Sequence, residues 1–234
     1  MSIHSSIHTV SKIVLSIALG TASLAYAFSL ADISNKDATA GVKTALEKGA
    51  DVAVEKLGVT NGFLNNDKVR IGLPGTVEKA MPLLRMMGQG KKLDELQVQM
   101  NHAAETAVAQ AKPLLINAVK SMSVTDAKNI LTGGDTSVTD FFRSKTSISL
   151  NKQFLPVVKK ITDKNNLSSK YNALMGKASQ SGLVSDKEST VEGYVTEQAI
   201  NGLYTVIAEE EKAIRADPVG TGSAILSKVF GAAK

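Results

Sequence analysis

Residues 190–216, TVEGYVTEQAINGLYTVIAEEEKAIRA, carry apolar side chains three and four positions apart along their whole length. This spacing is the period of an α-helix. The pattern starts after Thr190, and it is followed by Asp217 and Pro218, where proline cannot continue a helix. The sequence therefore predicts one long helix from Thr190 to Ala216 with one buried face. The apolar positions on that face are Val191, Tyr194, Val195, Ala199, Leu203, Val206, Ile207 and Ile214.

The same helical period recurs along most of the chain. Each apolar stripe is bounded by a glycine, a proline or a capping residue, which are the usual ends of helices. The helix expected over residues 93–111 is the second long one. Further helices are predicted over residues 42–57, 77–87, 114–122, 126–131, 136–161, 168–175 and 225–230.

Three local signals refine this pattern. Ser123 and Asp126 are three positions apart, which is the spacing of a capping box that starts a helix. Pro156 lies inside the stripe 136–161 and is expected to break that helix, because proline has no N–H to donate to the preceding turn. Residues 178–189 are polar and include a glycine, so we predict a loop there.

Residues 69–74, VRIGLP, depart from the helical pattern, since their apolar residues alternate with period two. A lone short strand without a partner is not stable, so we interpret this segment as an extended connector pressed against the helices. No repeat of fixed period and no linker rich in proline or serine divides the chain. The sequence therefore predicts an all-α fold, a single multi-helix domain over residues 41–231 with about eight to ten helices, two of them long, and no sheet.

The first residues have the pattern of a secretion signal. An apolar run covers residues 13–24, and Ala25 and Ala27 frame the small-x-small site that signal peptidase needs. The run is shorter than the ~20 residues that span a bilayer, and no second apolar run follows it. We therefore expect cleavage after Ala27, a flexible mature N-terminus over residues 28–40, and no transmembrane span in the mature chain.

The composition excludes several classes of chemistry. The chain has no cysteine and no tryptophan, and His102 is its only histidine outside the expected signal. Disulfides, thiol catalysis and nearly all zinc and copper sites are therefore excluded. The net charge is +5, but 23 of the 27 basic residues are lysines scattered among acidic ones, which does not suit a nucleic-acid partner. We expect no cofactor, no metal and no nucleic acid, and only a weak attraction to anionic lipid head groups.

No arrangement of side chains predicts a catalytic residue. His102 and Glu105 share one helix face, but a di-metal bundle needs such a pair twice and two further glutamates, so we interpret His102 as a surface histidine. No nucleophile-elbow string surrounds a serine, and a Ser–Lys pair remains formally possible among the many serines and lysines but has no spacing signature. The glycines in residues 86–92 and 133–135 are interpreted as turns between helices.

Arginine is scarce, with only four residues in the chain. Arg70 and Arg143 lie inside apolar strings, so we expect them to reach inward or across an interface and to pair with the EEE run that includes Glu210. For Arg143 in particular we expect a buried ion pair with that run. The alternative is that these arginines contact an anionic ligand, because a guanidinium makes planar, multidentate contacts. Glu211 and Arg215 are spaced for an i,i+4 pair on a solvated face.

Several strings together resemble a known family. They are GFLNN (62–66), VRIGLP (69–74), FFRSKTS (141–147), FLPVVKK (154–160), YNAL (171–174) and IAEEEKAIRADP (207–218). They are similar to strings of the domain of unknown function 4197, found in exported proteins of Gram-negative bacteria. The resemblance covers residues 41–231 and implies one all-helical domain and an envelope location, with no agreed activity, substrate or catalytic residue. Gly72 departs from the IPLP expected in the family, which makes the connector looser.

Two classes of function fit these expectations. The first is a non-enzymatic binding or interaction module for an apolar or amphiphilic ligand, or for an envelope protein, between helices rich in methionine and alanine. The alternative is an envelope hydrolase or transferase that uses carboxylate and lysine groups without a metal. An apolar groove without converging titratable groups favours the first class, and two carboxylates facing each other in a cleft favour the second.

Overall fold

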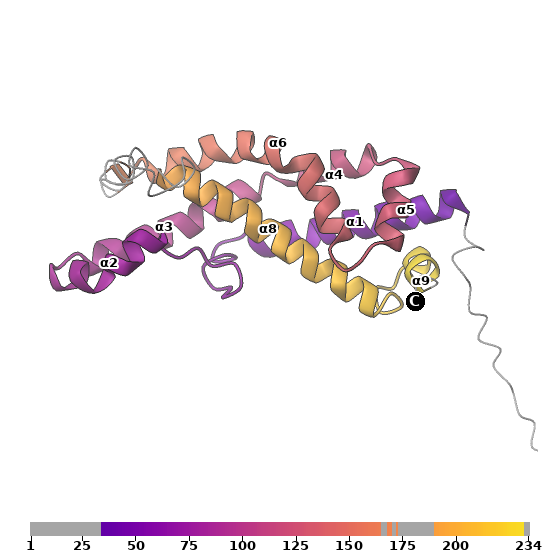
Figure 1. The fold of residues 1–234 in the computed structure, drawn as a ribbon, viewed down its shortest axis with the longest axis horizontal. Helices are drawn as coiled ribbons and strands as arrows, with labels where there is room; N and C mark the ends of the chain where they lie inside the picture. The colour runs from indigo at the N-terminus through magenta and orange to yellow at the C-terminus, as the bar shows by residue number, and fades with distance from the viewer. Residues whose placement is uncertain (1–33, 165–167, 170–171, 173–189, 232–234) are drawn as a thin grey trace, which may run out of the picture.

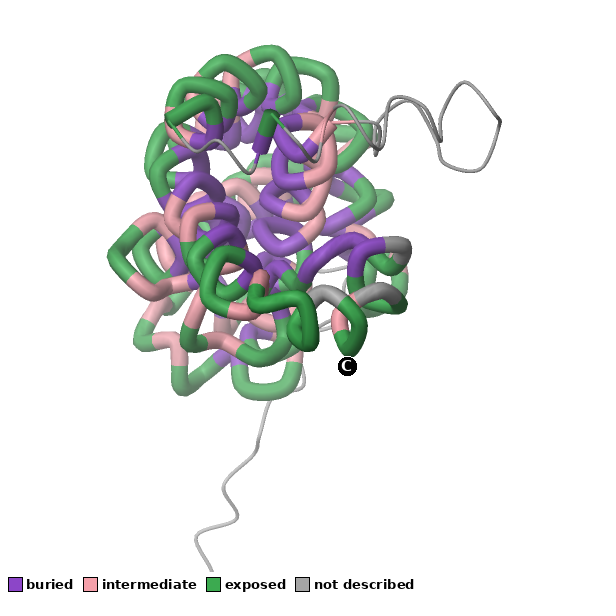
Figure 2. Tube along the Cα trace, turned by 90° about the vertical axis from the view of Figure 1, so that its left-hand side faces the viewer, coloured by how far each residue is buried: buried purple, intermediate pink, exposed green. Residues whose placement is uncertain are grey.

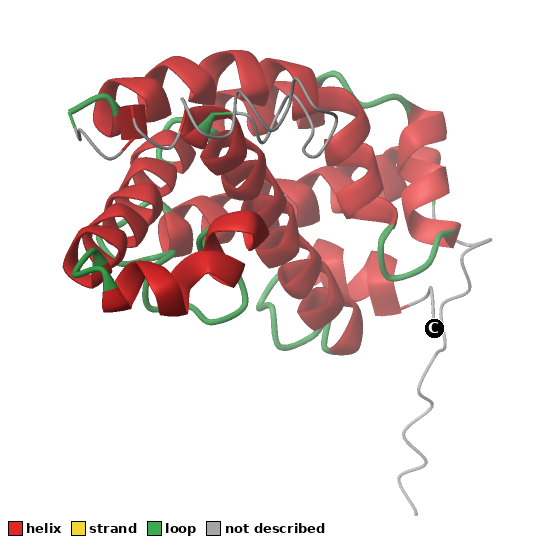
Figure 3. Cartoon of the chain, turned by 60° about the vertical axis from the view of Figure 1, so that its left-hand side comes forward, coloured by secondary structure: helices red, strands yellow, loops and turns green. Residues whose placement is uncertain are grey.

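The fold is all-helical. The computed structural model describes residues 34–164, 168, 169, 172 and 190–231. Within these residues the chain forms eight α-helices and no strand (Figure 3), which confirms the predicted fold class. The helices are α1 (Asn35–Leu57), α2 (Gly75–Met86), α3 (Gly90–Val108), α4 (Lys112–Lys120), α5 (Val124–Thr132), α6 (Ser137–Thr162), α8 (Val191–Ala216) and α9 (Ala224–Gly231). The secretion signal, the loop 178–189 and most of the short helix 168–175 lie outside the described residues.

Helix α8 is the centre of the packing. It packs along α6 and also contacts α1, α3 and α9 (Figure 1). Its side chains Leu203, Tyr204 and Ile207 are among the largest fully buried ones of the described chain. Buried residues line the interior between the helices, and exposed residues cover the outside (Figure 2). The apolar face predicted for residues 190–216 therefore contributes the middle of the hydrophobic core.

Helix α1 begins before its apolar stripe. The Ser34 hydroxyl accepts a hydrogen bond from the Asp37 N–H at 3.0 Å and caps the helix, so residues 35–40, which we expected to be flexible, are helical. At the same end of the molecule α1 packs against α9. Gly41 allows this contact, because a Cβ there would lie 2.5 Å from Val229 Cγ2. The first and last described helices are thus held together.

Local sequence signals fix several helix ends. The Ser123 hydroxyl accepts from the Asp126 N–H and the Asp126 carboxylate accepts from the Ser123 N–H, both at 3.0 Å, so the predicted capping box is confirmed. Gly58 caps the end of α1, and Gly133 caps the end of α5. Pro113 stands in the first turn of α4, where its missing N–H leaves no carbonyl unpaired. α3 and α4 are therefore separate helices, in agreement with the separate apolar stripes 93–111 and 114–122.

Pro156 does not break its helix, contrary to our prediction. Helix α6 continues past it to Thr162. On the inner face Phe154 and Val158 are fully buried, whereas Pro156 is exposed, as is Lys152, whose carbonyl loses its N–H partner. Water can solvate this carbonyl while burial of the inner face holds the helix together. The longest helices are consequently α6 and α8, each of 26 residues, and α3 is shorter, at 19 residues.

The segment 69–74 is an extended connector, as predicted. Val69, Ile71 and Leu73 are buried, and residues 70–74 have no regular secondary structure. The side chain of Asn101 on α3 accepts a hydrogen bond from the Ile71 N–H and donates one to the Ile71 carbonyl, both at 2.9 Å. One amide side chain thus supplies the paired hydrogen bonds that a neighbouring strand would give.

Candidate functional site

Arg143 lies on the surface of α6 and not in the core. It is exposed, one position after the fully buried Phe142, and its Nη1 donates a hydrogen bond to Asn201 Oδ1 at 3.3 Å. Its guanidinium carbon lies 4.9 Å from the centre of the Tyr204 ring, which is a cation–π contact. The predicted buried ion pair of Arg143 is therefore wrong, because its side chain meets a neutral amide and an aromatic face of α8.

The acidic run of α8 contacts other cations than those expected. Arg70 is half-exposed and pairs locally, and Glu210 pairs with a lysine of α1, so the structure does not bring Arg70, Arg143 and Glu210 together. Arg70 and Arg143 lie outside the core, because the apolar residues next to them in the chain occupy the buried positions. The observed pairs are Lys68–Glu209 and Lys56–Glu210, with 2.5 Å between Nζ and Oε1 in each, and Arg70–Asp67, with 3.3 Å between Nη2 and Oδ1.

Arg143 borders a groove between α6 and α8 with a volume of about 440 Å³. This volume is in the range of small-molecule sites. The lining combines charged, polar and apolar side chains, and Ile148 is 73% exposed there. The groove can therefore accommodate a small molecule with a charged part and an apolar part. The lining residues that bear on this point are Arg143, Ile148, Lys152, Glu197, Asn201 and Tyr204.

Tyr204 lines the groove from the core side. Its side chain is buried, and its hydroxyl lies 2.8 Å from Thr146 Oγ1. Burial raises the pKa of the Tyr204 phenol above its ordinary value, while the Thr146 hydrogen bond and the Arg143 charge act in the opposite direction. The phenol is therefore neutral at physiological pH. Tyr204 gives Arg143 an aromatic surface and no negative charge.

Glu105 has a structural role that sequence analysis did not reveal. The residue is 4% exposed. Its carboxylate accepts hydrogen bonds from the N–H groups of Asn61, Phe63 and Leu64, at 3.0, 3.1 and 3.2 Å. It thereby fixes the GFLNN turn on α3, and the turn places Phe63 against Gly202 of α8, where a Cβ would lie 2.6 Å from the ring. No sequence spacing marks this carboxylate, because its partners are backbone groups far away in the chain.

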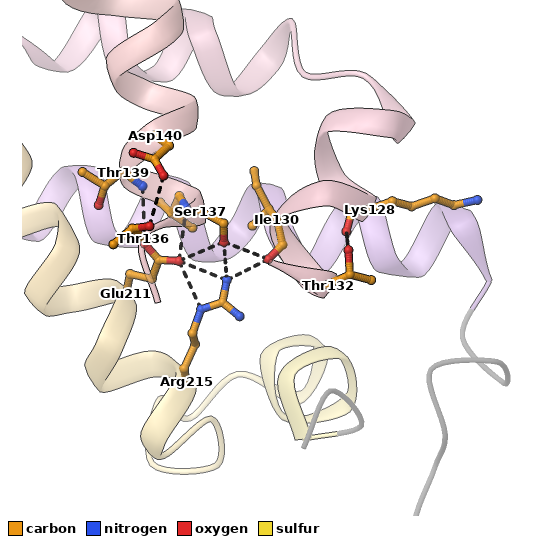
Figure 4. Close-up of polar contacts among 10 residues, drawn as sticks. Lys128, Ile130, Thr132, Thr136, Ser137, Thr139, Asp140, Glu211 and Arg215 are labelled. Atoms are coloured by element: carbon orange, nitrogen blue, oxygen red, sulfur yellow. Dashed lines mark hydrogen bonds and ion pairs between the residues drawn. The ribbon is translucent and has the colours of Figure 1, made fainter. Parts of the chain in front are cut away.

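Glu211, a residue of α8, is another buried carboxylate. Its side chain points toward the start of α6 (Figure 4). It accepts hydrogen bonds from the Val138 N–H at 3.1 Å and the Thr139 N–H at 3.4 Å, and Arg215 contacts it at 3.0 Å. The predicted i,i+4 pair is confirmed, but its expected solvated position is wrong. Burial raises the pKa of the Glu211 carboxyl, and the Val138 N–H, the Arg215 guanidinium and the Thr139 N–H oppose this shift.

Arg215 connects this carboxylate to two further helices. Its Nη2 donates to the Ile130 carbonyl near the end of α5 and to the Ser137 hydroxyl at the start of α6, both at 2.7 Å. Its guanidinium carbon also lies 5.4 Å from the centre of the Phe230 ring on α9. The group of Glu211, Arg215 and Ser137 therefore connects four helices. The polar groups of all three side chains take part in these contacts between helices.

His102 is half-exposed, as expected for a surface histidine. Its Nε2 lies 3.2 Å from Asn61 Oδ1 and 4.0 Å from Glu105 Oε2, and Glu105 already binds three backbone N–H groups. Among the residues that the structure describes, no group of three or more His, Cys, Asp or Glu side chains could hold a metal ion. Within the same described ranges, no helix is both long and apolar enough to cross a membrane.

A family model for proteins of unknown function, DUF4197, matches residues 32–231. The chain belongs to DUF4197. The match includes every helix from α1 to α9 that the structure describes, and it confirms the resemblance carried by strings such as GFLNN and VRIGLP. No curated protein and no solved structure matches the chain. The DUF4197 domain is therefore seen here as one helical unit with the groove beside α8.

Proposed function

We propose that this protein is a periplasmic, non-enzymatic binding module whose groove between α6 and α8 holds an amphiphilic ligand with an anionic group. The position of Arg143 carries the proposal. Its guanidinium lies over the face of Tyr204 and donates to the neutral amide of Asn201. A guanidinium has five N–H donors, so an arginine held by an amide and an aromatic ring retains the charge and the donors that an anion needs.

The groove contains titratable side chains, so it is not the purely apolar groove expected for a binding module, and with Glu197 as the one carboxylate among its described lining residues it also lacks the two facing carboxylates expected for a hydrolase. Its composition suits a ligand that is both charged and apolar. Lys152 adds a second positive charge and Glu197 adds one negative charge, so the ionisable lining is positive on balance. Ile148 provides exposed apolar surface beside these charges, and the mostly buried Ile200 also lines the groove. An anionic head group would contact Arg143 through charge-assisted hydrogen bonds, and an alkyl chain would cover Ile148 and remove it from water.

Arg143→Gln is expected to weaken the binding of an anionic amphiphile about tenfold or more, because a hydrogen bond to a charged group contributes about 1.5–3 kcal/mol. The probe is dodecyl phosphate below its critical micelle concentration, and binding is measured by isothermal titration calorimetry. Ile148→Ser is expected to weaken binding as well, since it removes the apolar contact. Arg70→Gln is the matched control, because Arg70 is also exposed but lies outside the groove.

Equal losses in Arg143→Gln and Arg70→Gln would show that general charge attraction, and not the groove, binds the probe. Absence of binding by the unmodified protein would contradict the proposal directly. Conversion of the probe to dodecanol and phosphate, abolished by Glu197→Gln, would favour the alternative of an envelope hydrolase. Circular dichroism checks that Arg143→Gln and Arg70→Gln are folded. We expect them to be, because substitutions of exposed side chains usually change stability little.

The periplasmic location is part of the proposal and has its own test. A precursor expressed in a Gram-negative host is expected to yield a periplasmic protein that begins at Phe28, because Ala25 and Ala27 fit the signal peptidase site. Intact-mass measurement of the osmotic-shock fraction decides this. A product that retains Met1, or one found only in the inner membrane, would contradict the assignment.

A further inference from the structure

Helix α2 and the start of α3 form a hairpin at one end of the molecule (Figures 1 and 3). α2 packs mainly against α3, with Val77 buried at its base. Residues 87–90 connect the two helices, and Gly88 adopts a φ of 74°, a left-handed conformation that glycine permits without strain. The hairpin therefore has an inner side against the molecule and an outer side towards solvent.

The outer side of α2 combines apolar residues with one lysine. Lys79, Pro82, Leu83 and Met86 follow one another at positions i, i+3, i+4 and i+7, so they share one face of the helix. Leu83 is 61% exposed, Met86 86% and Met87 64%. Exposed apolar residues elsewhere in the described chain are separated from one another in sequence, whereas these three lie within one turn and its cap. The tip therefore presents a small apolar patch to solvent.

The charges within this tip are positive, whereas the exposed acidic residues Glu78, Asp94 and Glu95 lie directly before and after it in the chain. Residues 79–92 contain four basic residues and no acidic one. Arg85 pairs with Asp94 at 2.7 Å, while Lys79, Lys91 and Lys92 are exposed. A helical tip that combines exposed apolar side chains with lysines suits the interface of an anionic membrane, where the apolar groups enter the acyl boundary and the ammonium groups meet the head groups.

We propose that the tip of the α2–α3 hairpin, formed by Leu83, Met86 and Met87 with Lys79, Lys91 and Lys92, binds the surface of an anionic phospholipid bilayer. Charge complementarity selects this occupant. A second copy of the chain is disfavoured, because a two-fold contact would place the same lysines of both copies against each other. Membrane binding at the tip is separate from ligand binding in the groove, since no residue of the tip lines the groove.

The test is co-flotation of the exported protein with vesicles made of equal parts phosphatidylglycerol and phosphatidylcholine. We expect binding to these vesicles, weak binding to pure phosphatidylcholine, and a loss of binding at high salt. Two triple variants should each bind at least about tenfold more weakly, since each basic residue near an anionic surface raises the affinity about fivefold. They are Leu83→Ser, Met86→Ser, Met87→Ser and Lys79→Gln, Lys91→Gln, Lys92→Gln.

Two control variants make the same chemical changes elsewhere on the described surface. They are Val59→Ser, Val124→Ser, Val219→Ser and Lys120→Gln, Lys128→Gln, Lys160→Gln, all at exposed positions. Both controls should bind within about twofold of the unmodified protein. Controls that lose as much binding as the tip variants would overturn the proposal, as would absence of binding to anionic vesicles or a dimer that the tip substitutions dissociate. Arg143→Gln should keep vesicle binding, which separates this test from that of the groove.

Discussion

Glu105→Ala is expected to lower the free energy of unfolding by about 3–5 kcal/mol, because each buried donor left without a partner costs about 1–3 kcal/mol. The substitution leaves the N–H groups of Asn61, Phe63 and Leu64 without their acceptor. The turn that holds Phe63 against α8 would then loosen. Chemical denaturation measures the loss of stability, and hydrogen exchange of the three amides shows whether it originates in this turn.

Two further substitutions sharpen this result. Glu105→Gln keeps one carbonyl oxygen and should retain part of the stability, since Phe63 and Leu64 both donate to Oε1. Glu95→Ala is the matched control, because Glu95 is an exposed glutamate on the same helix and its loss should change stability by less than about 0.5 kcal/mol. Equal effects of Glu105→Ala and Glu95→Ala would show that the buried carboxylate does not hold the turn.

Arg215→Ala should destabilise the protein by about 3–5 kcal/mol, because removal of one partner leaves the other charge of a buried pair uncompensated. Glu211 is 5% exposed and would lose the guanidinium whose positive charge offsets the cost of burying the carboxylate. Its pKa would rise further, so the folded variant would hold a proton that the unfolded chain releases. The destabilisation should therefore increase as pH rises above the ordinary range of a carboxyl group, and thermal melts across pH measure it.

Arg85→Ala provides the comparison for this variant. Arg85 and Asp94 form a pair at 2.7 Å in which both side chains are about half-exposed, and such pairs contribute about 0–1 kcal/mol. A double variant, Arg215→Met with Glu211→Gln, should be more stable than Arg215→Ala, because it leaves no charge unpaired and keeps an amide oxygen to accept from the Val138 N–H. If Arg215→Ala and Arg85→Ala have the same small effect, Arg215 does not hold the four helices together.

The sequence predicted the helices well because helix formation depends on short-range information. Apolar spacing, the Ser123 capping box and the glycine at residue 58 are all visible within a few positions. Pro156 was assigned wrongly for the opposite reason. Whether a proline ends a helix depends on which side of it is buried, and burial of Phe154 and Val158 depends on α3 and α8 from other parts of the chain.

The polar contacts were much less predictable. With the observed burial, a helical wheel places Arg143 beside the buried positions Phe142 and Thr146, at the edge of the buried face and not within it, and the burial of the polar Thr146 was not visible in the sequence. The partners of Glu105 could not have been found in this way. A carboxylate that accepts from backbone N–H groups needs no particular side chain opposite it, and these amides lie 41 to 44 positions away.

The packing of α1 against α8 and α9 has a consequence for biosynthesis. α1 ends at Leu57, whereas α8 begins at Val191, so a growing chain presents the part of α1 that α8 and α9 cover well before those two helices exist. At ~5–20 residues per second, this interval is on the order of ten seconds. Helices α4 and α5, which are made earlier, also contact α1 and can cover part of it, whereas the part that α8 and α9 cover stays accessible to a chaperone during this interval.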